Sequence, residues 1–158
     1  MLRCLLAAAL AALVTGCSGT PESVRPTIAG IVGLGYRCGD GIKDNVPSGL
    51  FQWHCDGAVN GTPSVVLVDG NAEGVAGVTL DVEPTNDPEL ARVGFARLVA
   101  AVTPLKAAPA LADTLIGWTG GQQWKIVGAV RVYAGCESTR CIVMVTPVDD
   151  ATRPMQLP

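Results

Sequence analysis

The stretch Ser64-Val65-Val66-Leu67-Val68-Asp69-Gly70-Asn71, with Gly77-Val78-Thr79-Leu80-Asp81-Val82-Glu83 shortly after it, decides the fold class of this chain. The first segment is a short β-branched run that ends in turn residues, which predicts a strand. In the second, Val78, Leu80 and Val82 alternate with polar residues, which predicts a strand with one buried and one solvated face. Two such neighbours favour an antiparallel meander.

Upstream and downstream of this pair, the pattern continues with a strand and a helix. Residues 50–55 alternate between apolar and polar side chains, so they predict a half-buried strand, and residues 31–38 can add another at the sheet edge. Asp87-Pro88-Glu89 is a strong helix start, because Asp can cap, Pro suits the first helical position and Glu favours the positive end of the dipole. Apolar residues then recur at helical spacing as far as Pro104.

The C-terminal third predicts a second helix and a hairpin. The helix is expected over about residues 109–118, stopped by Gly120-Gly121. Residues 124–133 predict one strand, with Trp124, Ile126, Val130 and Val132 on one face and Lys125, Arg131 and Tyr133 on the other. Residues 142–148 predict the returning strand. The expected fold is α+β: a single domain over residues 31–150, with an antiparallel sheet (meander plus C-terminal hairpin) and two helices packed on one face. Residues 151–158 are expected to be a disordered tail.

Length and charge limit the function classes. The chain has 158 residues, enough for one domain, and 49% of them are hydrophobic, enough for a core. Charged residues make up 16%, against roughly 25% in an ordinary soluble protein. The formal net charge is -3 and no basic run is present, so we expect no nucleic-acid partner.

The N-terminus is typical of an exported protein. Arg3 is followed by an apolar run over residues 4–14, which is shorter than the about 20 residues of a membrane-spanning helix. The next residues, Val14-Thr15-Gly16-Cys17, resemble the lipobox of bacterial lipoproteins. The resemblance implies that residues 1–16 are a signal peptide, that a diacylglycerol is attached to the Cys17 thiol, and that an acyl chain such as palmitate is added to the new amino group. The alternative is an ordinary cleaved signal with a coincidental Cys.

This resemblance implies a location at the cell envelope. The protein would be anchored by Cys17 to the cell membrane, or to the outer membrane if the cell has one. Removal of Arg3 with the signal leaves the chain more acidic, so the lipid and not a basic patch would hold it there. Residues 17–30 contain small residues and two prolines, which predict a flexible tether before the domain.

Four further cysteines predict disulfides, because their number is even and the compartment is oxidising. Of the three possible connectivities we predict Cys38–Cys55 and Cys136–Cys141, since each pair is local and brackets a turn-like stretch. A zinc site that uses these thiolates and His54 is the alternative. The spacings contain no C-x-x-C pair, so we expect no metal and no cofactor.

Three titratable residues are candidates for chemistry: His54, Asp81 and Glu83. His54 is the only histidine, and we expect it on the surface. Asp81 and Glu83 lie two apart on one strand face, where paired carboxylates can do acid–base work, although the solvated face of a strand usually carries such residues. No nucleophile motif accompanies them, and we predict that the protein is not an enzyme.

Two of the three tryptophans are candidates for recognition. Trp118 and Trp124 flank the flexible Gly120-Gly121 turn, and together they could bind a peptide, a glycan or a partner protein of the envelope. The alternative is that both cap the core where helix meets sheet.

The sequence thus predicts a lipid-anchored envelope protein with a small disulfide-stabilised binding or structural domain. One alternative is a carrier of an apolar ligand in a cavity between helices and sheet. A second is a small hydrolase, which would require Asp81, Glu83 or His54 to converge in a cleft.

Overall fold

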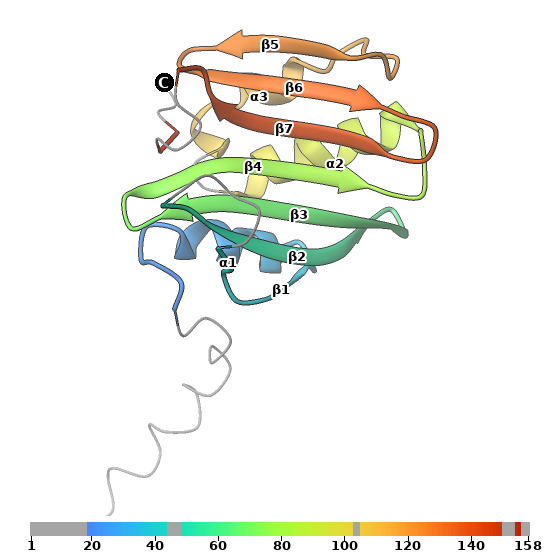
Figure 1. Cartoon of the computed structure of the whole chain (residues 1–158). Coiled ribbons are helices and arrows are strands. Elements are labelled where there is room, and N and C mark those ends of the chain that lie inside the picture. The colour runs from blue at the N-terminus through green and yellow to red at the C-terminus, as the bar shows by residue number, and fades with distance from the viewer. Residues whose placement is uncertain (1–18, 44–48, 103–104, 150–153, 156–158) are drawn as a thin grey trace, which may run out of the picture.

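The computed structural model describes residues 19–43, 49–102, 105–149 and 154–155, so residues 1–16, predicted to be a signal peptide, and Cys17 lie outside the described residues. In that part the chain forms an antiparallel sheet and three α-helices, which confirms the predicted α+β class (Figure 1). The helices are α1 (Arg25–Gly33), α2 (Pro88–Ala101) and α3 (Ala110–Asp113), with the 3-10 helix η2 (Leu105–Ala107). The strands are β1 (Arg37–Cys38), β2 (Phe51–Val59), β3 (Thr62–Asn71), β4 (Gly74–Val82), β5 (Gln123–Val127), β6 (Val130–Cys136) and β7 (Cys141–Pro147).

The strand order β1-β2-β3-β4-β7-β6-β5 joins two antiparallel runs. The first four strands form the predicted meander, the helices carry the chain to the far edge, and β5, β6 and β7 return to β4. The C-terminal run has three strands where a two-stranded hairpin was predicted. Residues 124–133, predicted to be one strand, belong to the two strands β5 and β6. Gly128 has a φ of 60° and lets the chain reverse between Val127 and Val130.

This turn also corrects the expected faces of the C-terminal strands. Trp124 lies opposite Tyr133, and Ile126 lies opposite Arg131, so these four side chains share one face of the sheet. Val132 lies on the other face. The prediction that placed Trp124 and Val132 together was wrong, since a turn between two strands resets the alternation that a single strand would continue.

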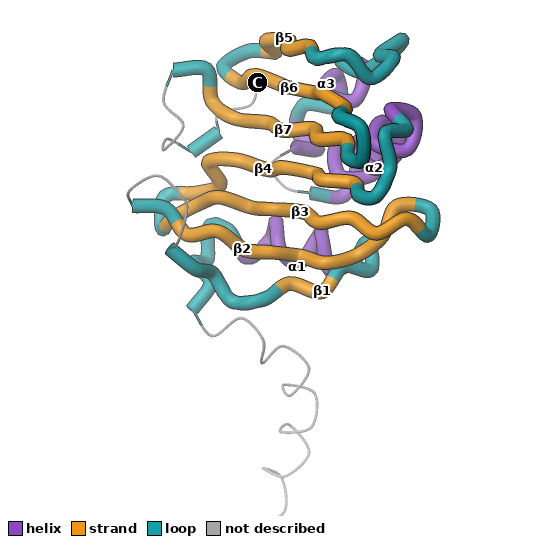
Figure 2. The backbone as a smooth tube through the Cα atoms, turned by 45° about the vertical axis from the view of Figure 1, so that its right-hand side comes forward, coloured by secondary structure: helices purple, strands orange, loops and turns teal. Residues whose placement is uncertain are grey.

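The core lies between the helices and the face of the sheet that carries Trp53, Cys55, Val66 and Leu80. In Figures 1 and 2 the helices lie behind the sheet. Helix α2 approaches it closely, because a Cβ atom on Gly94 would lie 2.7 Å from Val59 Cγ2 and 2.8 Å from Leu80 Cδ2. The interface between α2 and the sheet is therefore tightly packed at this point.

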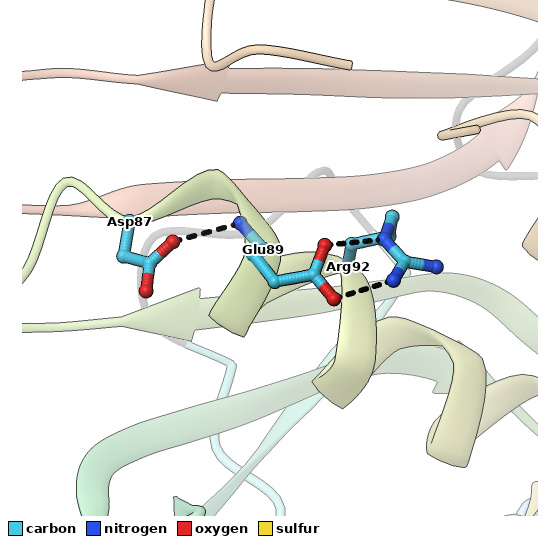
Figure 3. Close-up of polar contacts among 3 residues, drawn as sticks. All are labelled: Asp87, Glu89 and Arg92. Carbon is cyan, nitrogen blue, oxygen red and sulfur yellow. Dashed lines mark hydrogen bonds and ion pairs between the residues drawn. The ribbon is translucent and has the colours of Figure 1, made fainter. Parts of the chain in front are cut away.

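Helix α2 begins as the sequence predicted. The Asp87 side chain accepts a hydrogen bond from the Glu89 N–H at 2.9 Å, and Pro88 occupies the first turn (Figure 3). Glu89 in turn pairs with Arg92 one turn later, with Nε donating to Oε2 at 2.8 Å. An N-cap acceptor, an acidic first turn and an i,i+3 ion pair all favour this helix end.

The second predicted helix, over residues 109–118, is much shorter in the structure. Helix α3 covers only Ala110–Asp113, and turns follow it. The Thr114 hydroxyl donates to the Leu111 carbonyl at 2.6 Å, and Gly117 has a φ of 75°. The chain thus leaves the helix before the Gly120-Gly121 stop that the sequence suggested.

The predicted tether over residues 17–30 is wrong where the structure describes it. Helix α1 occupies residues 25–33, and Val24, Ile28 and Ile31 are buried in the core. Pro26 lies in the first turn of α1, where a missing N–H costs nothing, so this proline begins a helix and does not mark a linker. Because α1 continues as far as Gly33, only Arg37–Cys38 of the expected edge strand over residues 31–38 is a strand.

The predicted disordered tail needs a correction at one point. Met155 is buried, and its N–H donates to the Val75 carbonyl at 2.7 Å. Residues 150–153 and 156–158 lie outside the described residues.

Candidate functional site

The four cysteines form the two predicted disulfides, Cys38–Cys55 and Cys136–Cys141. Each bridge joins residues that lie directly opposite each other on neighbouring strands, β1 with β2 and β6 with β7. The first bridge ties the edge strand β1 to the sheet. The second closes the hairpin between β6 and β7.

The disulfide-closed hairpin is held at the end of the sheet by contacts on two sides. Arg140 Nη2 donates to Asp81 Oδ2 at 2.7 Å, and the Thr139 carbonyl accepts from the Thr85 N–H at 2.8 Å. On the other side, the Cys136 N–H donates to the Gly120 carbonyl at 2.8 Å. Thr85 precedes α2 and Gly120 follows α3, so these contacts connect the hairpin with both ends of the segment that contains these two helices.

The carboxylate of Asp81 belongs to this structural cluster. Its side chain is only 20% exposed, so the prediction of a solvated carboxylate was wrong for Asp81, although Glu83 is exposed. Burial raises the pKa of Asp81, the charge and hydrogen bond of Arg140 act against this rise, and the neighbouring Glu83 charge adds to it. The ion pair with Arg140 explains why Asp81 is tolerated in a half-buried position.

A depression of about 490 Å³ lies next to Asp81 at the end of β2, β3 and β4. It is wide open to solvent, and three carboxylates and two prolines are among the residues that line it. The lining residues are Asp56, Gly57, Pro63, Ser64, Val65, Asp81, Glu83 and Pro84. An open depression with a charged rim does not enclose an apolar ligand.

His54 is exposed, as predicted, and stands apart from these carboxylates. Its Nε2 lies 2.9 Å from Gln52 Oε1, and Gln52 Nε2 donates to Asp69 Oδ1 at 2.8 Å. Burial raises the pKa of Asp69, while the bond from Gln52 and the charge of His54 lower it. On β4, His54 has Thr79 in its row across the sheet and not Asp81. The structure thus gives His54 and Asp81 different partners.

The described residues form neither a cluster of metal ligands nor a helix that could span a membrane. In that part of the chain no three His, Cys, Asp or Glu side chains come together as metal ligands. None of the described helices combines the length and the apolar character that a membrane span requires.

The two candidate tryptophans have different surroundings. Trp118 is half-buried against the core, and its indole N–H donates to the Gly121 carbonyl at 2.5 Å. Trp124 is 62% exposed on β5, and the Arg131 guanidinium lies 5.6 Å from the centre of its ring, within cation–π range. Only Trp124 presents most of its surface to solvent.

Strand β5 places further side chains beside Trp124. Ile126 is 50% exposed on the same face, and Lys125 is exposed on the opposite face. In the described part of the chain β5 pairs with β6 alone, so its other edge carries free backbone groups. We define the β5 edge surface as Trp124, Lys125, Ile126 and Arg131. The sequence predicted Ile126 on the same face as Trp124 but placed Arg131 on the opposite face, and a two-residue turn at Gly128-Ala129 was the signal that could have shown Arg131 as a neighbour.

Comparisons with known proteins assign no relative to this chain. No protein-family model, no curated protein and no solved structure matches it.

Proposed function

We propose that the protein is an exported lipoprotein, held at the cell envelope by a lipid on Cys17, whose domain binds a partner and is not an enzyme. The supporting observation is the combination of the Val14-Thr15-Gly16-Cys17 motif with two disulfides that pair all the remaining cysteines after the signal. Disulfides persist in the oxidising compartments outside the cytosol. A thioether-linked diacylglycerol supplies two acyl chains, which is enough for stable anchoring.

The binding site in this proposal is the β5 edge surface. A free strand edge can pair with the backbone of an extended polypeptide, and alternate side chains of that polypeptide then meet one face of the sheet. Trp124 and Ile126 lie two residues apart on one face, so they suit a partner with apolar residues at alternate positions. Helices in one layer on the opposite face leave this face open.

Lys125 determines which kind of strand the edge accepts. It is the middle residue of β5, so antiparallel pairing with a second copy about this point would set two lysines opposite each other. Edge lysines discourage such self-association. The partner we propose is an extended segment of another envelope protein with an acidic residue opposite Lys125.

The two alternative functions receive less support. A carrier needs space between helix and sheet, but Gly94 has no room even for a Cβ atom against Val59 and Leu80. A small hydrolase needs convergent groups, but His54 bonds with Gln52 whereas Asp81 pairs with Arg140. These contacts favour a binding role over both.

The anchor is tested by the intact mass of membrane-extracted protein, measured with and without reduction beside Cys17→Ala. We expect a chain that begins at residue 17, carries two or three acyl chains and gains the hydrogens of two disulfides on reduction. An unmodified mass at Cys17 would refute the lipoprotein assignment and leave the disulfide-stabilised domain unaffected.

The binding surface is tested with synthetic peptides that alternate apolar residues around a central Glu or a central Lys. We expect the Glu peptide to bind and to shift the Trp124 fluorescence to shorter wavelength, and Lys125→Glu to reverse the preference. Trp124→Ala should abolish binding. Ile116→Ala is the matched control, since Ile116 is also exposed, at 67%, but lies outside β5. Binding that survives Trp124→Ala would refute this site.

A further inference from the structure

We infer that one end of the domain is held against the lipid headgroups, and that the domain does not move freely on a long tether. This inference rests on the proposed lipid anchor at Cys17. We call this end the anchor end, and it consists of residues 20–24, the β3–β4 turn at residues 71–74, and residues 154–155.

The first observation is how soon the chain enters the fold after Cys17. Thr20 is 6% exposed and Val24 is completely buried. Two residues, Ser18 and Gly19, separate Cys17 from Thr20, and an extended chain covers about 10 Å in the three residue steps from Cys17 to Thr20. The acylated residue therefore cannot be farther than this from the folded surface, which leaves almost no slack.

The entering segment is fixed to the turn between β3 and β4. The Ser23 hydroxyl donates to the Asn71 carbonyl at 3.0 Å, and Val24 packs so closely on β3 that its Cγ2 would be 3.0 Å from a Cβ atom on Gly70. The Asn71 side chain in turn accepts from the Glu73 N–H at 2.8 Å, which shapes the turn. A lipid on Cys17 thus brings this turn to the membrane surface.

The C-terminal residues reach the same end. The Met155 N–H bonds to Val75, the second residue of β4, and Pro154 lies 3.2 Å from the Cβ position of Gly74. In Figure 1 the β3–β4 turn lies at the left of the sheet, on the side where the blue N-terminal chain enters. The anchor end is therefore a surface built from three separate parts of the chain.

The disulfide-closed hairpin lies at the opposite end. Gly74 starts β4 at the anchor end, and Val82, which pairs with Cys141, ends it. Eight residue steps along a strand cover about 27 Å. With the anchor end on the headgroups, the hairpin and the open depression beside Asp81 and Glu83 face away from the membrane.

The charges of the anchor end do not explain this contact. Arg25 is exposed directly beside the anchor end, but the acidic residues Glu22 and Glu73 are exposed within it. Anionic lipids attract clusters of basic residues, and this end has none among its described residues. The contact is therefore set by the short chain between lipid and fold, and salt should not release it.

The test uses the full acylated protein in lipid vesicles that contain headgroup spin-labelled lipids as quenchers. A fluorophore is attached through p-azidophenylalanine at Glu73 or at Ser138, so that no cysteine is added. Both sites are exposed turn residues, at the anchor end and in the distal hairpin respectively. We expect strong quenching at position 73, and no quenching above the free-solution background at position 138. Insertion of twelve Gly and Ser residues after Ser18 should remove the difference.

The outcomes separate the inference from the proposed function. Absence of acyl mass would refute the anchor itself. With acylation established by mass, equal quenching at the two positions, or stronger quenching at position 138, would overturn the orientation. A difference that persists in the spacer variant would overturn the short chain as its cause.

Discussion

Strand β1, at one edge of the sheet, has two residues and is disulfide-bonded to β2, whereas β5, at the other edge, has five and is bonded to β6 only through its backbone. The β1 side is also covered, because Tyr36 packs under Gly57 and bonds to Ser64 at 2.8 Å. On β5 the three middle residues are exposed. Proteins usually protect strand edges against pairing with other chains. An edge that is left open and carries exposed apolar side chains therefore supports the proposal that β5 binds a partner.

The largest effect should come from the disulfide of the β1 edge. Its loop spans 17 residues, whereas that of the hairpin disulfide spans 5. Loop-closure entropy predicts that Cys38→Ala with Cys55→Ala lowers the free energy of unfolding by about 3 kcal/mol, against about 2 kcal/mol for Cys136→Ala with Cys141→Ala. Denaturant unfolding of the two double variants measures both. An equal loss of unfolding free energy in both variants would show that the longer loop of the β1-edge disulfide gives no additional stability.

Cover of the β1 edge can be weakened without touching a cysteine. A Cβ atom on Gly57 would lie 2.5 Å from Cδ1 and 2.6 Å from Cγ of the buried Tyr36 ring. Gly57→Ala should therefore lower the free energy of unfolding by about 1–3 kcal/mol, as overpacking does. Gly33→Ala is the control, because no atom lies within 4 Å of its Cβ position and alanine favours a helix. A Gly57→Ala variant as stable as this control would contradict the packing argument.

The open edge should respond very little in stability. Trp124→Ala and Ile126→Ala remove exposed side chains, so each should change the free energy of unfolding by no more than about 0.5 kcal/mol. The same unfolding experiment tests both variants, with circular dichroism as a check of folding. A loss as large as that of Gly57→Ala would mean that Trp124 serves stability and would remove the contrast between the edges.

The smallest effect concerns the β1 side of the sheet, where Asp69 on β3 lies opposite Gln52 on β2. Burial raises the pKa of Asp69 in the folded state above its ordinary value, which the unfolded chain keeps. At a pH between the ordinary and the raised pKa, the folded state therefore holds the Asp69 proton more firmly than the unfolded state does. The free energy of unfolding should then fall as pH rises through this interval, and Asp69→Asn should flatten the slope. An NMR titration of the carboxyl gives the pKa, and Gln52→Ala should raise it further, because a bond to the charged form is lost. A pKa at or below the ordinary value would contradict the burial argument.

How far the fold followed from sequence depends on whether the signal was local. The meander and the Asp87 cap were predicted, since alternation and capping are patterns within a few residues, and both disulfides were predicted because each joins cysteines on either side of a turn-like stretch. Helix α1 was missed, because its prolines and small residues resemble a linker. The helix is stabilised by burial of Val24, Ile28 and Ile31 in the core, which the local sequence does not show. Propensity alone does not hold a nine-residue helix in water.

The candidate site was only half predictable. Trp124 was selected together with Trp118, yet Trp118 is bonded to Gly121 and packs on the core. Which of two tryptophans is exposed depends on where the helical layer ends, and that is set by contacts between distant segments. The neighbours of Trp124 also depended on the turn at Gly128, which reverses the face of every residue after it.

The sequence by itself determined the α+β class and the helix that begins at Asp87, because adjacent residues carry those signals, and it predicted the cysteine pairing because each pair encloses a turn-like stretch. It also contains the motif from which we propose the lipid anchor. Only the tertiary structure decided that β7 pairs with β4, that β5 is left at an open edge, and that the chain after Cys17 enters the fold almost at once. Such features arise from packing among residues far apart in the chain, where burial of apolar surface outweighs local preference.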